Sequence, residues 1–372
     1  MASPRLSVVQ LLPALESGGV EQGTLEVAAE LVRGGHRSIV LSAGGRMVKP
    51  LLAAGSEHYN WSIGAKNPLT LRYIFALRHL LQRQRVTLLH ARSRLPAWIA
   101  YLAWRSLPPS QRPRFITTAH GLYSVKYYSA IMARGERVIA VSDTVRRYLL
   151  DHYPHSCADR IVTIYRGVDP LRYFPGLRPS EQWYREWYQQ FPQTQGKRWL
   201  LLPGRLTRLK GHLDFLQLVA QLCRHHPDLH ALIVGGEDPK RRAYAQALYR
   251  QVAAQGLGQQ LTFTGVRDDL REIMASSHLV YSLSSHPESF GRTTLEALSL
   301  GIPVVGYDHG GVGEILAQLL PEGRTPPHAV AAALQKSLEL LANPPRPRPN
   351  TLYTSEQMLK NTLRLYQELA TL

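Results

Sequence analysis

Short apolar segments and helical segments alternate along this chain in two successive series, and this alternation restricts the fold more than any other feature. In the first series, Leu6–Leu12 has strand character, a Gly-containing turn follows, 24–33 has a helical period, and Ser38–Ser42 is the next strand. Strand, turn, helix and strand in this order open a parallel α/β domain. The same succession restarts at Trp199. We therefore predict two parallel α/β domains.

The length of 372 residues agrees with two domains, because a single hydrophobic core stops growing at roughly 250–300 residues. We predict an N-terminal domain at residues 1–165 and a C-terminal domain at 166–349, with 171–196 as a polar, aromatic connector. Residues Pro344–Pro349 cannot be helical and form a stiff bridge. A last helix in 350–372 is expected to return to the N-terminal domain.

Composition excludes several classes of protein. Two cysteines are too few for a disulfide scaffold or a cysteine-based metal site. No apolar run reaches the roughly 18 residues of a membrane span. The N-terminus lacks the basic region, apolar core and cleavage site of a secretory signal. These observations predict a soluble, cytoplasmic protein.

The net charge of +17 is unevenly distributed. Residues 1–165 hold 21 Lys and Arg against 9 Asp and Glu, whereas residues 166–372 hold 23 against 18. A basic half favours an acidic partner, such as nucleic acid, an anionic membrane surface or a phosphorylated substrate. Charge alone does not choose among these partners.

The stretch from Glu288 to Glu296 reads as a strand, a loop and a helix. A helix whose first turn is Phe290–Thr293 would present backbone N–H groups that lack intrahelical partners, at the positive end of its dipole, and would suit a phosphate. Glu296 would lie in the same helix and accept hydrogen bonds from sugar hydroxyls. A solvent-exposed helix would show the same pattern, so this stretch does not settle the function by itself.

A basic loop upstream strengthens the interpretation. Arg205 and Lys210 follow the strand at Trp199–Pro203 and could neutralise a diphosphate. The Gly-x-Gly-x-x-Gly fingerprint and the Walker pattern are both absent. A nucleoside diphosphate ligand therefore fits better than a dinucleotide, although both cations could also be surface charges. His120 follows a strand at 114–118, and ligand sites of open α/β sheets lie at the carboxyl ends of strands.

In combination these motifs resemble the retaining glycosyltransferases of family 4, which have the GT-B fold, over nearly the full length. The version here looks most like bacterial enzymes of the lipopolysaccharide core. The motifs that carry the resemblance are Glu16-Ser17-Gly18-Gly19-Val20-Glu21, His120-Gly121, Val141-Ser142, Gly167-Val168-Asp169, Gly204-Arg205 with Lys210-Gly211, Glu288 to Glu296, and Asp308-x-Gly310-Gly311-x-x-Glu314.

The resemblance implies two Rossmann-like domains facing across a cleft, and transfer of a hexose from a nucleotide sugar, with UDP favoured, to a hydroxyl with retained configuration. It implies that Arg205 and Lys210 stabilise the leaving diphosphate, and that Glu288 contacts the sugar. It implies that the backbone amides of Ser289, Phe290, Gly291 and Arg292 bind sugar and phosphate, and that Glu296 binds the ribose. Gly18 and Gly19 would approach the donor phosphate and the acceptor, and His120 the donor sugar near its reacting carbon.

Neither a protein nucleophile nor an Asp-x-Asp motif is evident, so we expect no metal and no cofactor besides the donor. In a front-face route the leaving phosphate helps to deprotonate the acceptor. Two positions depart from the family pattern. Arg166 stands where Asn commonly precedes Gly-Val-Asp, a change expected to matter little. Arg292 stands where a small or apolar residue is frequent, and its effect on donor choice stays open.

The resemblance also suggests a use for the positive charge, because the N-terminal domain takes the acceptor in this fold. We predict an acceptor or membrane patch at Arg92, Arg94, Trp98 and Lys126, facing a phosphorylated glycolipid at the anionic inner face of the cytoplasmic membrane. The alternative is that the tryptophans belong to the core and the arginines are merely solvated.

Several other functions compete with this one, among them a glycan-binding pseudoenzyme, against which the presence of both carboxylates and both cations argues. Within the fold they are a GDP-mannose-type mannosyltransferase, a nucleotide-sugar epimerase and a phosphorylase, although no lysine for pyridoxal phosphate is evident. From another class, a nucleic-acid-binding protein would bind DNA or RNA in a salt-sensitive way without needing Glu288 or Glu296. The favoured function involves no nucleic acid, and the oligomeric state is not predicted.

Overall fold

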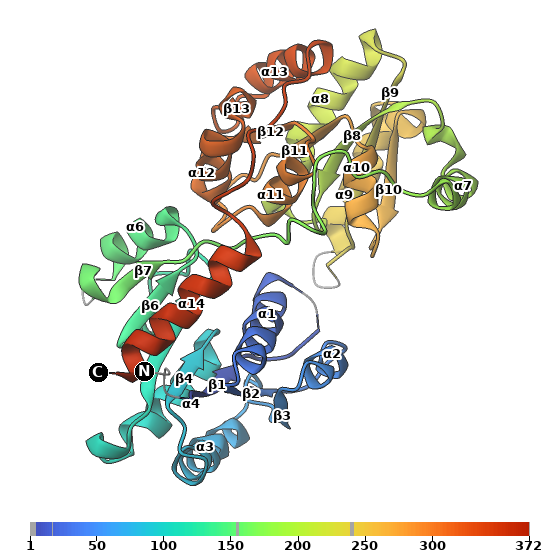
Figure 1. Ribbon diagram of the computed structural model, residues 1–372. Helices are drawn as coiled ribbons and strands as arrows, with labels where there is room; N and C mark the ends of the chain where they lie inside the picture. The colour runs from blue at the N-terminus through green and yellow to red at the C-terminus, as the bar shows by residue number, and fades with distance from the viewer. Residues whose placement is uncertain (1–4, 17, 154–155, 239–241, 372) are drawn as a thin grey trace. The chain divides into compact units, whose positions relative to one another are not determined.

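The computed structural model describes residues 5–16, 18–153, 156–238 and 242–371. The chain forms two compact units, one of residues 1–166 with 355–372 and one of residues 167–354. We call them unit 1 and unit 2, and each is described by itself. The last helix, α14 (Ser355–Ala370), belongs to unit 1 although it follows the whole of unit 2 in sequence (Figure 1).

Unit 1 is built on a seven-stranded sheet with the order β3-β2-β1-β4-β5-β6-β7. Every neighbouring pair is parallel. The strands are β1 (Ser7–Leu11), β2 (Arg37–Ser42), β3 (Glu57–Asn60), β4 (Leu88–Ala91), β5 (Arg114–Ala119), β6 (Arg137–Ala140) and β7 (Ile161–Thr163). Parallel strands buried on both faces require near-continuous apolar sequence, which these short runs supply.

Helices cover both faces of this sheet. They are α1 (Gly19–Arg33), α2 (Val48–Ala53), α3 (Arg72–Arg83), α4 (Arg94–Arg105), α5 (Tyr127–Ala130) and α6 (Asp143–His152), together with α14. On one face, α1 and α14 bury Val27, Leu31 and Tyr366 against the strands. On the other face, α3 and α4 bury Leu77 and Ala100. The C-terminal helix is thus part of the unit 1 core, as the sequence predicted.

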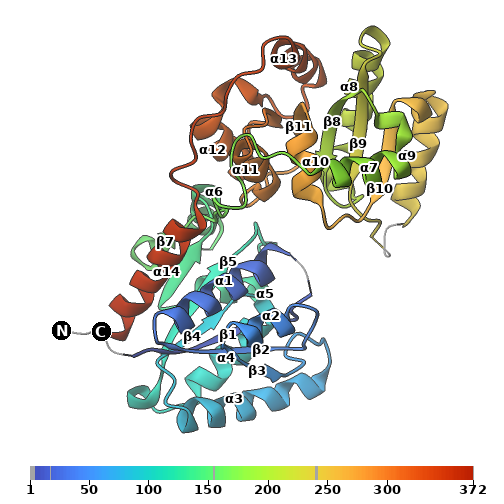
Figure 2. The ribbon, with the colours of Figure 1, turned by 45° about the vertical axis from the view of Figure 1, so that its right-hand side comes forward.

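Unit 2 repeats the architecture with six parallel strands in the order β10-β9-β8-β11-β12-β13 (Figure 2). The strands are β8 (Arg198–Pro203), β9 (Leu229–Val234), β10 (Leu261–Gly265), β11 (Leu279–Ser282), β12 (Val304–Tyr307) and β13 (Arg324–Thr325). The helices are α7 (Glu181–Gln190), α8 (His212–His225), α9 (Arg242–Ala254), α10 (Leu270–Ser276), α11 (Arg292–Ser299), α12 (Gly310–Leu319) and α13 (Val330–Ala342).

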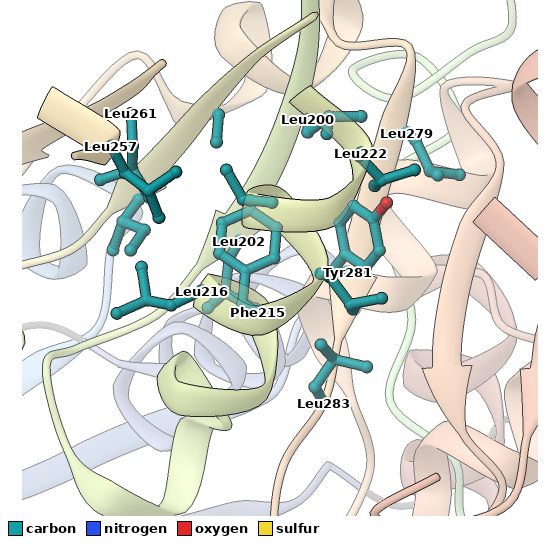
Figure 3. Packing of buried hydrophobic residues seen from close by; sticks show 14 of the residues in the cluster. Leu200, Leu202, Phe215, Leu216, Leu222, Leu257, Leu261, Leu279, Tyr281 and Leu283 are labelled. Carbon is teal, nitrogen blue, oxygen red and sulfur yellow. The ribbon is translucent and has the colours of Figure 1, made fainter. Parts of the chain in front are cut away.

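Two neighbouring strands of unit 2, β8 and β11, pack together in its hydrophobic core. Leu200 of β8 and Leu279 of β11 are register partners, and both are fully buried (Figure 3). Phe215 and Leu222 of α8 pack into the same cluster. Because β8 and β11 are parallel, their carboxyl ends meet at one edge of the sheet, and the loops that follow them lie side by side.

The α/β architecture is confirmed, but several helix starts differ from the sequence prediction. Helix α1 begins at Gly19, not Thr24, and α11 begins at Arg292, not Phe290. The sequence predicts a turn at Gly310-Gly311, whereas helix α12 begins at Gly310, and α7 lies inside the expected connector. Glycine has poor helix propensity, so the sequence pattern does not predict a helix start at Gly19 or Gly310, where tertiary packing nevertheless places one. The predicted start of α9 at Lys240 lies outside the described residues.

No helix in the described part of the chain combines the length and the apolar character that crossing a membrane requires.

Candidate functional site

Two loops at the carboxyl edge of the unit 2 sheet are fastened together. One follows β8 and contains a 3-10 turn at Arg208–Lys210, and the other follows β11. The N–H of Ser285 donates to the carbonyl oxygen of Leu209 at 2.9 Å. Gly211 has φ 72°, and a Cβ there would lie 1.9 Å from the carbonyl oxygen of Leu283. Only glycine permits this approach, which sets the place of Lys210 just before it.

Lys210 and Glu288 form an ion pair across the two loops. Lys210 Nζ lies 2.8 Å from Glu288 Oε1, and the hydroxyl of Ser284 donates to the same oxygen. Burial alone would raise the pKa of Glu288, but the charge and hydrogen bond of Lys210, with the bond from Ser284, bring it below the ordinary glutamate value. Glu288 is therefore ionised at neutral pH, and its second oxygen can accept a hydrogen bond from a ligand.

Arg205 offers a second cation in the same loop. Its side chain is exposed, and it makes no hydrogen bond or ion pair with any residue that the structure describes. The loop thus carries one cation held by a carboxylate and one that is available to an anion. A diphosphate needs such charge neutralisation, which arginine supplies with a fork of N–H donors.

The loop after β11 leads into α11 through Gly291, whose φ of 92° favours glycine. The N–H of Leu295 donates to the carbonyl oxygen of Gly291 at 3.1 Å, and this bond opens the hydrogen-bond ladder of α11. Ser289 and Phe290 come just before. The ring of Phe290 is buried against Tyr353, so this side chain packs the loop.

Glu296 lies one turn into α11 and is 8% exposed. Arg292 Nε donates to its Oε1 at 2.9 Å, and Tyr173 bonds to the same carboxylate. Burial raises the pKa of Glu296, while Arg292 and Tyr173 oppose the rise. Sequence reasoning missed Tyr173 because it comes from the segment between the units' sheets and has no motif of its own. It also left open the role of Arg292, which the structure pairs with Glu296.

In unit 1, Gly18 and Gly19 form the turn into α1, after β1. Gly18 has φ 139°, and nothing lies within 4 Å of a Cβ built on Gly19. This helix start is therefore open on the side of Gly19. Ser17, which precedes them in the motif, lies outside the described residues.

His120 follows β5 directly and is partly buried. Its nearest charged neighbour is Arg166, whose Nη2 lies 2.8 Å from His120 Nδ1. Burial, followed by the charges of Arg166 and Arg92, holds the pKa of His120 well below the usual histidine value. The imidazole is thus neutral. Arg166 was expected to matter little, and the structure instead places it against a predicted site residue.

Arg92 was predicted to belong to a surface patch, and this prediction is wrong. Arg92 is only 2% exposed, and its Nε donates to Gln10 Oε1 at 2.8 Å in the interior of unit 1. Tyr366 of α14 bonds to it as well. A charge on a buried strand end is tolerated when polar partners surround it, and α14 supplies such a partner from far along the sequence.

The other patch residues lie at or near the surface. Trp98 Nε1 donates to the carbonyl of Tyr128 at 2.9 Å, and the Trp98 ring lies 5.3 Å from that of Tyr127. Arg94 donates to Ser129, and its guanidinium stands over two tyrosine rings. Trp98 and Arg94 thus hold the segment that contains exposed Lys126. We call Trp98, Val125, Lys126, Tyr127, Tyr128 and Arg134 the aromatic–basic patch.

No cluster of three or more His, Cys, Asp or Glu among the described residues is arranged to hold a metal ion.

Comparisons with known proteins agree with this geometry. The profile of Glycosyltransferase Family 4 matches residues 17–172, and that of Glycosyl transferases group 1 matches residues 184–355. A glycosyltransferase from Rickettsia africae is 27% identical, with a TM-score of 0.83 over 98% of both chains. Anabaena Alr3699/HepE, solved with UDP-glucose, is 19% identical, with a TM-score of 0.76 over 99% of both chains.

WaaG, a glycosyltransferase involved in lipopolysaccharide biosynthesis, is 17% identical with a TM-score of 0.66, over 98% of this chain and 94% of that one. Likeness at this level of identity concerns the fold. The two profiles together cover most of the chain, one on each unit, and the cationic loop and carboxylates lie within the second. The chain belongs to the glycosyltransferases of the GT-B fold, with a family 4 domain followed by a group 1 domain.

Proposed function

We propose that the protein transfers a hexose from a UDP-sugar to a hydroxyl of a lipid-linked saccharide, such as the lipopolysaccharide core, with retained anomeric configuration. The observation that carries the proposal is the Lys210–Glu288 ion pair beside unpaired Arg205, at the start of α11. Two cations beside the N-terminus of a helix, the positive end of its dipole, suit a diphosphate.

Each residue has a role in this proposal. Arg205 and Lys210 stabilise the charge that grows on the leaving diphosphate. Glu288 accepts hydrogen bonds from the donor sugar, and the amides of Ser289 to Arg292 meet sugar and phosphate. Glu296 binds the ribose, with one of its oxygens already held by Arg292. In unit 1, we assign His120 to the donor sugar, and Gly18 and Gly19 to its phosphate and the acceptor, on the strength of the family resemblance.

The bond between the anomeric carbon of the donor sugar and the diphosphate oxygen breaks. The acceptor hydroxyl oxygen attacks this carbon from the face that the diphosphate leaves. The acceptor proton passes to the leaving phosphate oxygen. Because attack and departure occur on the same face, retention needs no protein nucleophile. In this route, the electrostatic groups of unit 2 supply the main catalytic effect.

A panel of nucleotides tests the donor assignment. A ligand that binds only the native protein raises the melting temperature, by an amount that grows with its concentration above Kd. We expect UDP and UDP-hexoses to stabilise the protein more than GDP, ADP or their sugars. Greater stabilisation by GDP-mannose would replace the UDP assignment, and stabilisation by none of them would refute the donor site. Conversion of a UDP-sugar without acceptor would indicate an epimerase instead.

We also propose that unit 1 binds an anionic membrane surface, where a phosphorylated glycolipid acceptor would lie. From residue 58 to residue 135 the sequence has twelve Lys and Arg and no Asp or Glu. The aromatic–basic patch lies in this region, with Tyr127 72% exposed. Phe75 of α3 is 74% exposed in the same region. Exposed aromatic and basic side chains without acidic neighbours suit a lipid headgroup layer.

Vesicle sedimentation tests this surface. We expect the protein to bind phosphatidylglycerol-containing vesicles and not pure phosphatidylcholine vesicles. The double variant Lys126→Ala, Tyr127→Ser should bind about tenfold more weakly, since one basic residue near the bilayer contributes about 1 kcal/mol and an inserted ring adds to it. Leu171→Ser, at an 85% exposed position in unit 2, is the matched control. Equal binding by the double variant and the control would refute this role of the patch.

A further inference from the structure

Arg166 lies over the imidazole of His120. Its Nη2 is 2.8 Å from Nδ1 and 3.3 Å from Nε2. An in-plane donor to one ring nitrogen points away from the other, so an atom this close to both stands over the face of the ring. The guanidinium therefore covers one face of His120, and the edge of the ring that carries the two nitrogens is not capped by this contact.

Arg166 is itself held in place by two helices. Its Nη1 lies 3.5 Å from the sulfur of Met358 in α14. A Cβ built on Gly23 of α1 would lie 2.9 Å from the same nitrogen, so glycine makes room for the guanidinium there. Arg166 is also the last residue of unit 1 before the chain enters unit 2. The contact with His120 is thus part of a packed arrangement.

The charges that face His120 from the surrounding elements are all positive or neutral. Arg166 follows β7, Arg92 follows β4, and His90 lies on β4. Tyr123 accepts a hydrogen bond from the backbone N–H of His120. One carboxylate in this network, that of Glu26, acts on Arg92. No carboxylate among the described residues bonds to the His120 ring, so nothing compensates an imidazolium.

We propose that Arg166 is a positioning residue that keeps His120 neutral and fixed, so that His120 serves the transfer as an uncharged hydrogen-bonding group and not as an acid or base. This inference rests on the proposed function, in which His120 contacts the donor sugar. A neutral imidazole offers one donor and one acceptor to sugar hydroxyls. With Arg166 in place, burial and the nearby positive charges hold the pKa of His120 well below its ordinary value, so the ring keeps this state at neutral pH.

The direct test is an NMR titration of the His120 ring, with its signal assigned by comparison with His120→Gln. In the unaltered protein, the His120 signal should not titrate between about pH 5.5 and 8. In Arg166→Met, which removes the charge and keeps the length, the pKa should rise by about one pH unit or more, as expected for loss of one close charge. Arg166→Lys retains the charge and should keep the pKa low.

Arg160→Met, at an exposed position of unit 1, is the matched control and should leave the His120 pKa unchanged. The melting temperature without ligand shows whether each variant is folded, since all of these substitutions lie in unit 1. In transfer assays, kcat/KM of Arg166→Met should begin to fall at a higher pH than kcat/KM of the unaltered enzyme, because the pKa of His120 is raised.

A His120 that titrates near the usual value of about 6.5 in the unaltered protein would overturn the proposal. An unchanged His120 pKa in Arg166→Met would also overturn it. These outcomes are distinguishable from failure of the proposed function, because the NMR titration needs no substrate. If His120→Gln leaves transfer unaffected, the role of His120 in the proposed function fails, while the effect of Arg166 on the ring is judged separately.

Discussion

Lys210→Met is expected to reduce turnover by about 10²–10³-fold, the usual effect of removing one group that stabilises charge developing in the transition state. The ammonium of Lys210 is already ordered by Glu288 before any donor binds. It therefore needs no reorganisation when negative charge grows on the leaving diphosphate. Methionine keeps the alkyl stem that packs over Gly204, where a Cβ would lie 3.1 Å from Lys210 Cδ. The fold of the loop should survive.

Steady-state kinetics with saturating donor, together with a UDP-binding measurement, checks this expectation. The fall should appear mainly in kcat, since an interaction made only in the transition state affects kcat and kcat/KM alike. Lys336→Met is the matched control, because Lys336 makes only a surface ion pair with Glu339 in α13. Turnover equal to that of the control would remove Lys210 from its proposed role, whereas a loss confined to donor binding would make it a binding group only.

The double α/β plan could be predicted because buried parallel strands leave continuous apolar runs in the sequence. The starts of α1 and α12, which both begin with glycine, could not be predicted. At α12, a Cβ on Gly311 would lie 2.4 Å from the carbonyl oxygen of Phe290. Glycine is present there because the loop after β11 packs against the helix start. This reason is a tertiary contact, and local propensity gives the opposite indication.

The candidate site likewise contains features that the sequence predicts and features that depend on tertiary contacts. Lys210 and Glu288 could be assigned to one site in advance because the family motifs include both, but their ion pair became visible only in the structure. Arg92 could not be placed, since its burial depends on Tyr366, which lies far away in sequence on α14. The contacts of Tyr173 with Glu296 and of Arg166 with His120 are likewise long-range. Sequence therefore predicted which loops form the candidate site, whereas the partners that set the charge states of its residues became visible only in the folded chain.

Glu288→Gln is expected to reduce kcat/KM by about 10²-fold and to change how stability depends on pH. Glutamine keeps the size of the side chain but leaves Lys210 without its counter-charge. Losing a hydrogen bond between charged groups costs about 2 kcal/mol. The folded-state pKa of Glu288 lies below the ordinary value of 4.5. Its ionised form therefore stabilises the fold above that value, and this stability is lost as pH falls through the lowered folded-state pKa.

Melting temperatures measured from about pH 7 down to pH 3 check the sign. At pH 7, Glu288→Gln should melt below the unaltered protein, and the difference should shrink as the pH falls below the ordinary glutamate pKa. Glu322→Gln, at an exposed position of unit 2, is the control and should show no such convergence. A difference that stays constant with pH would mean that the Glu288 charge does not contribute to stability.

Combining Lys210→Met with Glu288→Gln shows whether the two residues act together or independently. Lys210 and Glu288 are in contact, so their effects should not add. If the carboxylate acts mainly by ordering the ammonium, Lys210→Met with Glu288→Gln should lower kcat no more than Lys210→Met alone. If Glu288 also contacts the donor sugar, as proposed, the double variant should show a further rise in KM for the donor. A kcat loss equal to the product of the two single losses would contradict the coupling that the 2.8 Å contact indicates.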